Sequence, residues 1–317
     1  MSDVVICECF ARDGLQHEPE HLSLQTKLAL IDRFTEMGLT RIEATSYSNP
    51  KVIPQFADAT ELLAGIKRGD GVYYKATCAN VRAVERALAD TEKGIGANEI
   101  SLLVSATDSH SLKNLKRTRD DQWKNIADMV AAANGRYRMV GTISMAFGCP
   151  FEGRVSESEV LKDVEKFSKA GVQLVALGDT TGMAVPATTQ RLFSAVMKEF
   201  PDVVPVAHFH DSRGTGIVNY LVAYESGVRY FDCAMGGVGG HPTEVKYGGG
   251  FTGNVCTEDW VNLLESMGVT TGIDLEKMMA TSAYCESVLG RQLYSKVALS
   301  GLNPLLDLPA ATPVSIS

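Results

Sequence analysis

Short apolar runs alternate with longer amphipathic stretches along most of the chain. The first run, residues 4–10, is bounded by turn residues and has the character of a buried strand. The stretch after it begins at Ser23, a favourable helix N-cap, and repeats apolar residues at helical spacing as far as Phe34. Gly38 follows, and glycine is common just after a helix ends. This order predicts a strand, a helix and a return to the next strand.

The same strand-then-helix order repeats as far as residue 234. We predict strands at residues 4–10, 40–46, 72–78, 99–105, 139–145, 173–177, 203–210 and 229–234. We predict helices at residues 24–37, 56–66, 81–89, 122–134, 157–170, 188–200 and 217–226, with a polar, basic loop at 108–117. Parallel strands need helical crossovers, so this repetition predicts an α/β fold of the (β/α)8 TIM barrel type. No G-x-G-x-x-G pattern follows the first strand, which disfavours a dinucleotide-binding sheet.

Two extra helices are predicted beyond the barrel, at residues 258–267 and 275–289. No segment resembles a linker that would divide the chain. We therefore expect one catalytic domain over residues 1–308, including this C-terminal helical extension, and a flexible tail over residues 309–317. The 317 residues are 45% hydrophobic and 21% charged, which is ordinary for a globular protein.

Charge and composition exclude several classes of protein. A net charge of -8 and a pI near 5.3 argue against a nucleic-acid partner, which calls for a basic face. No apolar run approaches the roughly 18–20 residues that span a bilayer, so no membrane partner is expected. The seven cysteines are scattered and odd in number, and no signal peptide precedes the first strand. These features predict a cytoplasmic protein with reduced thiols.

Two histidines end the seventh predicted strand. Alternate side chains of a strand share a face, so His208 and His210 should point the same way and Phe209 the other. Two neighbouring imidazoles can bind a metal, whereas a hydrogen-bonded pair at a crowded strand end is the alternative. The carboxyl ends of the strands in such barrels meet at one mouth, where the active site lies.

Further polar residues are predicted at the same mouth. Arg12 and Asp13 follow the first strand, Glu43 lies in the second, and Asp179 follows the sixth. Each has another explanation: Asp13 could cap a turn, Asp179 could form an Asx-turn, and Glu43 could pair with Arg41 or Arg12. Their convergence with the two imidazoles nevertheless predicts a divalent metal site with open positions.

A glycine-rich stretch, residues 236–240, follows the eighth predicted strand and leads to His241. Glycines let a backbone fold close over a ligand, so a lid over the mouth is predicted, with a plain flexible loop as the alternative. Further on, Asn254 can offer an amide oxygen to a hard cation. Its other possible role is that of a turn residue before the next helix.

Together these motifs resemble those of a known family. The motifs are Arg12-Asp13-Gly14-Leu15-Gln16, Ile42-Glu43-Ala44-Thr45-Ser46, Gly148-Cys149-Pro150-Phe151-Glu152-Gly153, His208-Phe209-His210-Asp211, the glycine-rich stretch and Gly253-Asn254-Val255-Cys256-Thr257-Glu258-Asp259. In this order they resemble 3-hydroxy-3-methylglutaryl-coenzyme A lyase, a member of the metal-dependent lyase and aldolase barrels. The resemblance covers residues 4–297.

The resemblance implies cleavage of 3-hydroxy-3-methylglutaryl-CoA to acetyl-CoA and acetoacetate, a step of leucine degradation. By position, the ligands of Mg²⁺ or Mn²⁺ would be Asp13, His208, His210 and Asn254. Arg12 would stabilise the oxyanion that develops on the thioester, and Glu43 would order Arg12 and the metal-bound water. Asp13 is one candidate for the base, and other carboxylates remain open.

Coenzyme A, as part of the substrate, would lie across the mouth. Its phosphates need cations, and Lys113, Lys116 and Arg117 in the basic loop are candidates, although such a loop is often only solvated. The predicted substrate-binding set is completed by Gln16, Asn49, Asn80, Asp179 and Arg213. A homo-oligomer, namely a dimer, is also expected.

Three features depart from the family pattern. His241 stands where the family carries a cysteine that protonates the enolate, so His241 is predicted as the proton donor. The loop beyond it carries an insert, residues 244–247, and Arg213 replaces a usual tyrosine. The alternatives are therefore a lyase for another branched thioester of the malyl or citramalyl type, a CoA-independent 4-hydroxy-2-oxo-acid aldolase, and a non-catalytic metal-binding barrel.

Overall fold

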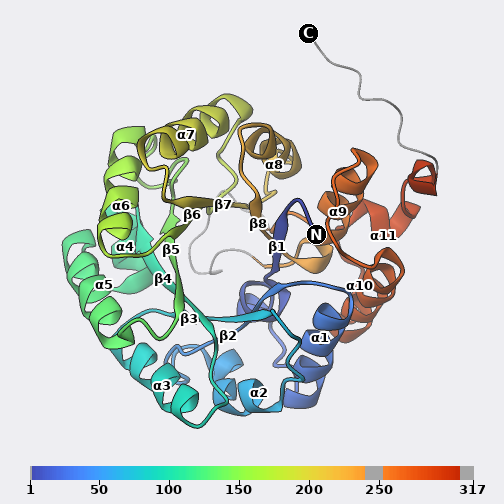
Figure 1. Ribbon diagram of the computed structural model, residues 1–317, viewed down its shortest axis with the longest axis horizontal. Coiled ribbons are helices and arrows are strands. Elements are labelled where there is room, and N and C mark those ends of the chain that lie inside the picture. The colour runs from blue at the N-terminus through green and yellow to red at the C-terminus, as the bar shows by residue number, and fades with distance from the viewer. Residues whose placement is uncertain (1, 240–252, 308–317) are drawn as a thin grey trace.

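The computed structural model describes residues 2–239 and 253–307, and these residues form a closed barrel. Strands β1 to β8 follow one another around the barrel in chain order, and each strand is parallel to its neighbours. Figure 1 looks along the barrel, with the strands at the centre and the helices around them. The predicted (β/α)8 TIM barrel is confirmed.

The predicted strands are all present, with ends shifted by a few residues. The strands are β1 Val5–Glu8, β2 Arg41–Ser46, β3 Tyr73–Cys78, β4 Glu99–Ser105, β5 Arg138–Ser144, β6 Leu174–Asp179, β7 Val204–Phe209 and β8 Tyr230–Cys233. The helices are α1 Leu24–Glu36, α2 Ala59–Gly65, α3 Val81–Glu92, α4 Asp108–Leu115, α5 Arg119–Ala133, α6 Glu157–Lys169, α7 Pro186–Glu199, α8 Gly216–Glu225, α9 Thr257–Ser266, α10 Leu275–Leu289 and α11 Lys296–Ser300. None of these helices is long and apolar enough to cross a bilayer.

The prediction of a loop over residues 108–117 is wrong, because α4 occupies most of that segment. The buried face of α4 is built from His110 and Ser111, which are polar. A helix that buries polar side chains lacks the apolar periodicity by which helices are recognised in a sequence.

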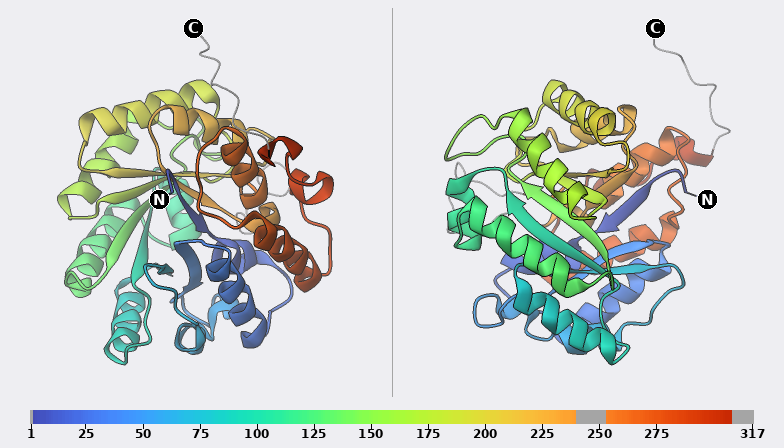
Figure 2. Two further views of the ribbon diagram at one scale, coloured as in Figure 1. Left: turned by 45° about the vertical axis from the view of Figure 1, so that its right-hand side comes forward. Right: turned by 60° about the vertical axis from the view of Figure 1, so that its left-hand side comes forward.

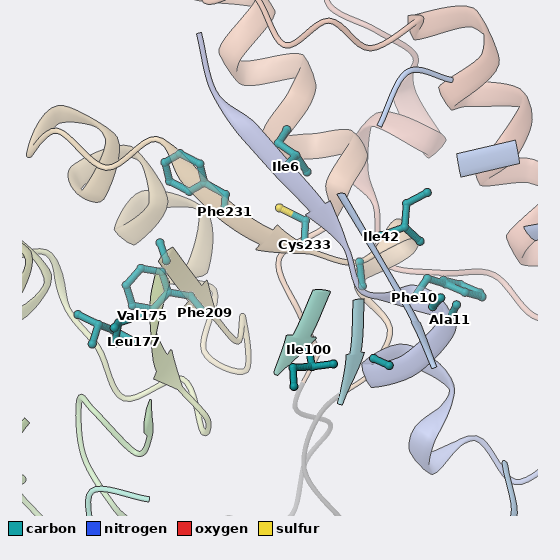
Figure 3. Close-up of a cluster of buried hydrophobic side chains, with 14 of the residues drawn as sticks. Ile6, Phe10, Ala11, Ile42, Ile100, Val175, Leu177, Phe209, Phe231 and Cys233 are labelled. Atoms are coloured by element: carbon teal, nitrogen blue, oxygen red, sulfur yellow. The ribbon is translucent and has the colours of Figure 1, made fainter. Parts of the chain in front are cut away.

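The hydrophobic core lies between the barrel and its helices. Alternate strand residues point outward into this layer, and Figure 3 shows Ile42, Val175, Phe209 and Phe231 among them. All four side chains are fully buried. The residues between them along each strand must therefore point into the barrel.

The interior of the barrel is divided into an apolar and a charged half. The apolar half comes from β5, β6 and β7 and forms a cluster separate from the outer core: Val140, Leu174, Ala176 and Val206. The charged half comes from β2, β3, β4 and β8 and consists of Arg41, Glu43, Lys75, Glu99 and Asp232, all buried. Buried charges are costly unless they are paired.

The charges of this half pair with one another across the strands. Arg41 Nε lies 2.8 Å from Glu99 Oε1, and Arg41 Nη1 lies 3.2 Å from Asp232 Oδ1. Lys75 Nζ lies 3.5 Å from Asp232 Oδ2 and 3.6 Å from Glu43 Oε2. Cations and carboxylates thus alternate from the first residues of the strands toward the mouth.

The C-terminal helices lie on the outside of the barrel, where α10 packs beside α1, as Figures 1 and 2 show. The segment before α10 crosses the end of α1, where Asp274 N donates to Met37 O at 2.9 Å. Only glycine fits at Gly38, because its φ is +99° and a Cβ there would stand 2.5 Å from Gly272 O. The predicted extra helices are confirmed, whereas the predicted tail, 309–317, lies outside the described residues.

Gly141 of β5 provides a test of this packing, because it lies against the ring of Phe167 in α6. A Cβ at Gly141 would stand 2.6 Å from two ring carbons. Gly141→Ala should lower the free energy of unfolding by about 1–3 kcal/mol, the usual cost of overpacking, as measured by urea denaturation. In a Phe167→Leu background the same change should cost clearly less. Equal costs in both backgrounds would show that the ring does not oppose the added methyl group.

Candidate active site

The residues after β1 form a π-helical turn, Phe10–Gly14, that carries two of the predicted site residues. Such turns are rare and occur frequently at functional sites. Arg12 Nε donates to Glu43 Oε1 at 2.7 Å, and Arg12 Nη1 donates to Gln16 Oε1 at 3.1 Å. Of the two partners considered for Glu43, the structure therefore selects Arg12.

β7 ends beside this turn with both histidines on one face. The ring centroids of His208 and His210 lie 5.2 Å apart, while Phe209 packs outward against Tyr220. Asp13, His208 and His210 each bring one potential ligand atom into a group whose atoms all lie within 4.8 Å of one another. The predicted alternation along this strand is confirmed.

Asn254 completes the group from the segment after the glycine-rich stretch. Its Nδ2 donates to Asp13 Oδ2 at 2.7 Å and to Val238 O at 3.0 Å, which leaves the buried Oδ1 without a hydrogen-bond partner among the described residues. The buried His210 Nε2 likewise has no such partner within the described chain. An unpaired buried acceptor is costly. The carboxylate, imidazole and amide groups here therefore fit a divalent cation.

Neighbouring charges set the protonation states of this group. Burial disfavours the ionised form of Asp13, but Arg12, His210 and His208 hold the pKa of its carboxyl well below the usual range. Burial, together with His208, lowers the pKa of His210 to about 4. Near neutral pH, Asp13 is therefore a carboxylate and His210 a neutral imidazole, which are the forms that bind metals.

Asp232 of β8 orients the other histidine. Its Oδ2 lies 3.5 Å from His208 Nδ1. Burial opposes the charged imidazole, but the contact with Asp232 raises the pKa of His208. A carboxylate at Nδ1 fixes the ring and leaves Nε2 for the group around Asp13.

The side chains around Asp13 open onto a cavity of about 150 Å³. Arg12, Asp13, His208 and His210 line one side of it. The wall also carries many hydroxyl groups: Ser46, Ser48, Thr77, Ser101, Thr142, Ser144 and Thr180. A concave site with a few charged groups and many hydrogen-bonding groups suits a small polar substrate.

Comparison with known proteins identifies the family. The HMGL-like family model matches residues 3–285. The chain belongs to the HMGL-like family. Human mitochondrial hydroxymethylglutaryl-CoA lyase is 36% identical over 296 residues, which span 93% of this chain and 88% of the human protein. Hydroxymethylglutaryl-CoA lyase of Bacillus subtilis is also 36% identical, over 92% of this chain and 95% of that protein. The predicted family and the prediction of a carbon–carbon lyase are confirmed.

A solved structure extends this similarity to three dimensions. The HMG-CoA lyase of Acinetobacter baumannii, in complex with coenzyme A and 3-methylmalate, has a TM-score of 0.88 and 38% identity. The match covers 98% of this chain and 97% of that chain. The similarity in sequence is therefore matched by a similarity in fold over almost the full length of this HMGL-like chain.

The structure brings some of the predicted site residues together and places others elsewhere in this HMGL-like protein. Those brought together around Asp13 are Arg12, Gln16, Glu43, His208, His210 and Asn254. Asn80 instead caps α3 by accepting the Ala83 N–H at 3.1 Å, and the exposed Asn49 accepts the Lys51 N–H at 3.0 Å. Both amides thus have local structural partners away from the Asp13 group.

Asp179 and Arg213 hold the loop after β6 instead of lining the cavity. Asp179 accepts the N–H groups of residues 183 and 184 at 2.7 and 3.0 Å, and burial raises its pKa to about 6. Arg213 Nη1 donates to the carbonyl groups of residues 181 and 182 at 2.5 and 3.1 Å. Asp179 thus has the turn role that was considered for it, and Arg213 contacts the same loop; the substrate-binding role of both residues stays a prediction.

The lysines predicted to bind CoA phosphates lie on or just after α4. Lys113 is exposed and its Nζ lies 4.2 Å from the centroid of the Phe151 ring. Lys116 is exposed at the end of the helix, with a φ of +56°. Their neighbours Asn114 and Leu115 line the cavity, so both lysines lie near its mouth.

Three titratable residues of the cavity wall were not predicted, and two predicted features fall outside the described part of the chain. His241 and the insert 244–247 lie outside the described residues. Asp232, Lys75 and His110 line the cavity and were not predicted. A signal existed for the first two, because each is a lone charge within a strand. Such a charge is buried only where partners or a site require it.

Gly239 tests the close packing of the glycine-rich stretch on the ligand group. A Cβ there would stand 2.7 Å from Asn254 Nδ2 and 2.9 Å from Asp13 O. Gly239→Ala should therefore displace these groups and weaken Mn²⁺ binding by about tenfold or more, as measured by calorimetry. Gly214→Ala is the matched control, because Gly214 also has a positive φ, +70°, but nothing within 4 Å of an added Cβ. Equal Mn²⁺ affinities in the two variants would contradict this arrangement.

Proposed function

We propose that the protein is a divalent-metal-dependent lyase that cleaves 3-hydroxy-3-methylglutaryl-CoA, or a close 3-hydroxyacyl-CoA, to acetyl-CoA and a keto acid. The observation that carries this proposal is the largely buried donor group of Asp13, His208, His210 and Asn254. Asp13 and the two histidines line one cavity together with Arg12. Family membership supports the same chemistry. The names of the human and Bacillus relatives support the acyl group.

These four side chains would hold Mg²⁺ or Mn²⁺. The metal, when bound, would polarise substrate oxygens and lower the pKa of the C3 hydroxyl. The depressed pKa of Asp13 supports its role as a ligand more than as a base, since such a carboxylate accepts protons weakly.

In this reaction the carbon–carbon bond between C2 and C3 of the substrate breaks. A base removes the hydroxyl proton, the C3 oxygen forms a ketone, and the electrons of the broken bond move onto the thioester as an enolate. The guanidinium of Arg12 stabilises the enolate oxygen. Glu43 holds this guanidinium through Arg12 Nε, and Arg12 Nη1 contacts Gln16 and Asp13. A proton delivered to C2 then completes acetyl-CoA. His241 is the proposed donor, on the strength of the sequence.

Further observations support the location and the substrate-binding residues. Seven cysteines that are all free and buried in the structure fit the proposed cytoplasmic location. Gln16 contacts Arg12 and lines the cavity, which supports a role in substrate binding. Lys113 and Lys116 near the mouth support a site for CoA phosphates. Leucine degradation and a homodimer follow from the family resemblance.

A cleavage assay on several substrates tests the function. The purified protein would be incubated with Mg²⁺ or Mn²⁺ and each of 3-hydroxy-3-methylglutaryl-CoA, a citramalyl-type thioester, a methylmalyl thioester and a free 4-hydroxy-2-oxo acid. The methylmalyl compound is included because the Acinetobacter lyase was crystallised with 3-methylmalate. We expect release of acetyl-CoA from the first substrate, lost with a chelator and restored by metal. Cleavage of the free acid alone would favour the aldolase, and no cleavage of any thioester would refute the proposal.

Arg12 provides a sharper test. Arg12→Lys keeps the charge but loses the planar fork that both contacts Glu43 and faces the site. We expect kcat to fall by about 10²- to 10³-fold, the scale of losing one oxyanion-stabilising donor. Arg33→Lys on α1, outside the cavity, is the control and should leave kcat unchanged. An Arg12→Lys enzyme within a factor of a few of wild type would remove Arg12 from the mechanism.

A further inference from the structure

Lys75 is a buried cation directly beneath the site. It lies on β3, opposite Glu43 of β2 in the strand register, and both side chains point into the barrel. Only 2% of Lys75 is exposed, yet it lines the cavity. A lysine is rarely buried to this extent unless its charge is paired with a carboxylate.

The two carboxylates that face Lys75 each hold a different functional side chain. Glu43 accepts from Arg12 Nε at 2.7 Å, and Asp232 lies 3.5 Å from His208 Nδ1. Lys75 Nζ lies 3.6 Å from Glu43 and 3.5 Å from Asp232. Lys75 therefore lies between the carboxylate that holds the proposed oxyanion-stabilising group and the carboxylate that holds a proposed metal ligand.

The remaining hydrogen bonds of these carboxylates show where the charge of Lys75 is needed. Glu43 Oε1 also accepts from Thr77 Oγ1 at 2.6 Å, so Oε1 is fully engaged. Glu43 Oε2 has no hydrogen-bond partner among the described residues, and Lys75 Nζ is the cation that faces it. Asp232 Oδ1 is paired with Arg41, so its Oδ2 is shared between His208 and Lys75.

Without a cation between them, two buried carboxylates repel each other and lose hydration. Each would then rotate or take up a proton, and its hold on Arg12 or His208 would weaken. We propose that Lys75 is a positioning residue, which acts through Glu43 and Asp232 to keep Arg12 and His208 in their working orientations. This inference rests on the proposed lyase function, and it adds a residue that acts without touching the reacting atoms.

The test is chemical rescue of a truncated side chain. Lys75→Ala should lower kcat by about 10- to 100-fold, the usual effect of removing a group that orients metal ligands, and should leave KM within about threefold. The deletion enlarges the cavity beside the two carboxylates, so methylammonium or ethylammonium should enter and restore much of kcat in a saturable way. Lys75→Met fills the space without a charge, so it should be equally slow and should not respond to the amines.

Lys27 supplies a matched control. It is also buried and paired with a carboxylate, since its Nζ lies 2.8 Å from Asp58 Oδ1, but it lies on α1 outside the barrel. Lys27→Ala should lower stability without changing kcat and without any response to amines. A fall in kcat in Lys75→Ala that amines do not reverse would mean that the loss is structural, and would overturn the proposal. A rise in KM with unchanged kcat would mean that Lys75 binds substrate directly, which overturns it as well.

A crystal structure of Lys75→Met separates this inference from the proposed function. We expect the contacts of Arg12 with Glu43 and of His208 with Asp232 to be lost or rearranged. Retention of both contacts would refute the positioning role even if wild type proved inactive on every thioester. Conversely, wild-type inactivity with rearranged contacts would refute the proposed function alone.

Discussion

The pairing of charges inside the barrel is the constraint on which the rest of the site depends. Arg41, Glu99, Asp232, Lys75 and Glu43 are almost fully excluded from solvent, so none can keep its charge without an opposite charge within reach. The observed pairs satisfy this in a connected series, and the series ends at Arg12 and His208 in the cavity wall. The same contacts therefore stabilise the buried charges of the interior and orient the side chains of the site.

The geometry of the strands brings this series of paired charges to the mouth of the barrel, where Glu43 meets Arg12. The register of β2 against β3 shifts between Glu43 and Thr45, and a local irregularity of this kind can re-aim side chains next to an active site. On the other side of β2, its neighbour β1 is followed by a π-helical turn from which Arg12 contacts Glu43. Two local irregularities in otherwise regular backbone thus provide the contact that links the charge series to the cavity.

Much of this arrangement could be predicted from the sequence because it follows from periodicity. The alternation of strands and helices predicts the barrel, and the barrel places the ends of β1 and β7 together, so Asp13, His208 and His210 could be predicted as one group. The contacts of Lys75 and Asp232 could not, because strand register decides which charges meet across the interior. Helix α4 was missed for a related reason, since its buried face is polar.

The division of the interior explains why the site lies where it does. Val140, Leu174, Ala176 and Val206 form an apolar cluster on the side of the barrel that β5, β6 and β7 make, and the charge series fills the opposite side. His208 continues the inward-facing row of β7 directly beyond Val206, so it stands at the border of the two halves. On one side an apolar packing excludes water, which strengthens every electrostatic interaction nearby. On the other, the paired charges hold their orientation before any substrate arrives, and this preorganisation is the form in which charges stabilise a transition state most effectively.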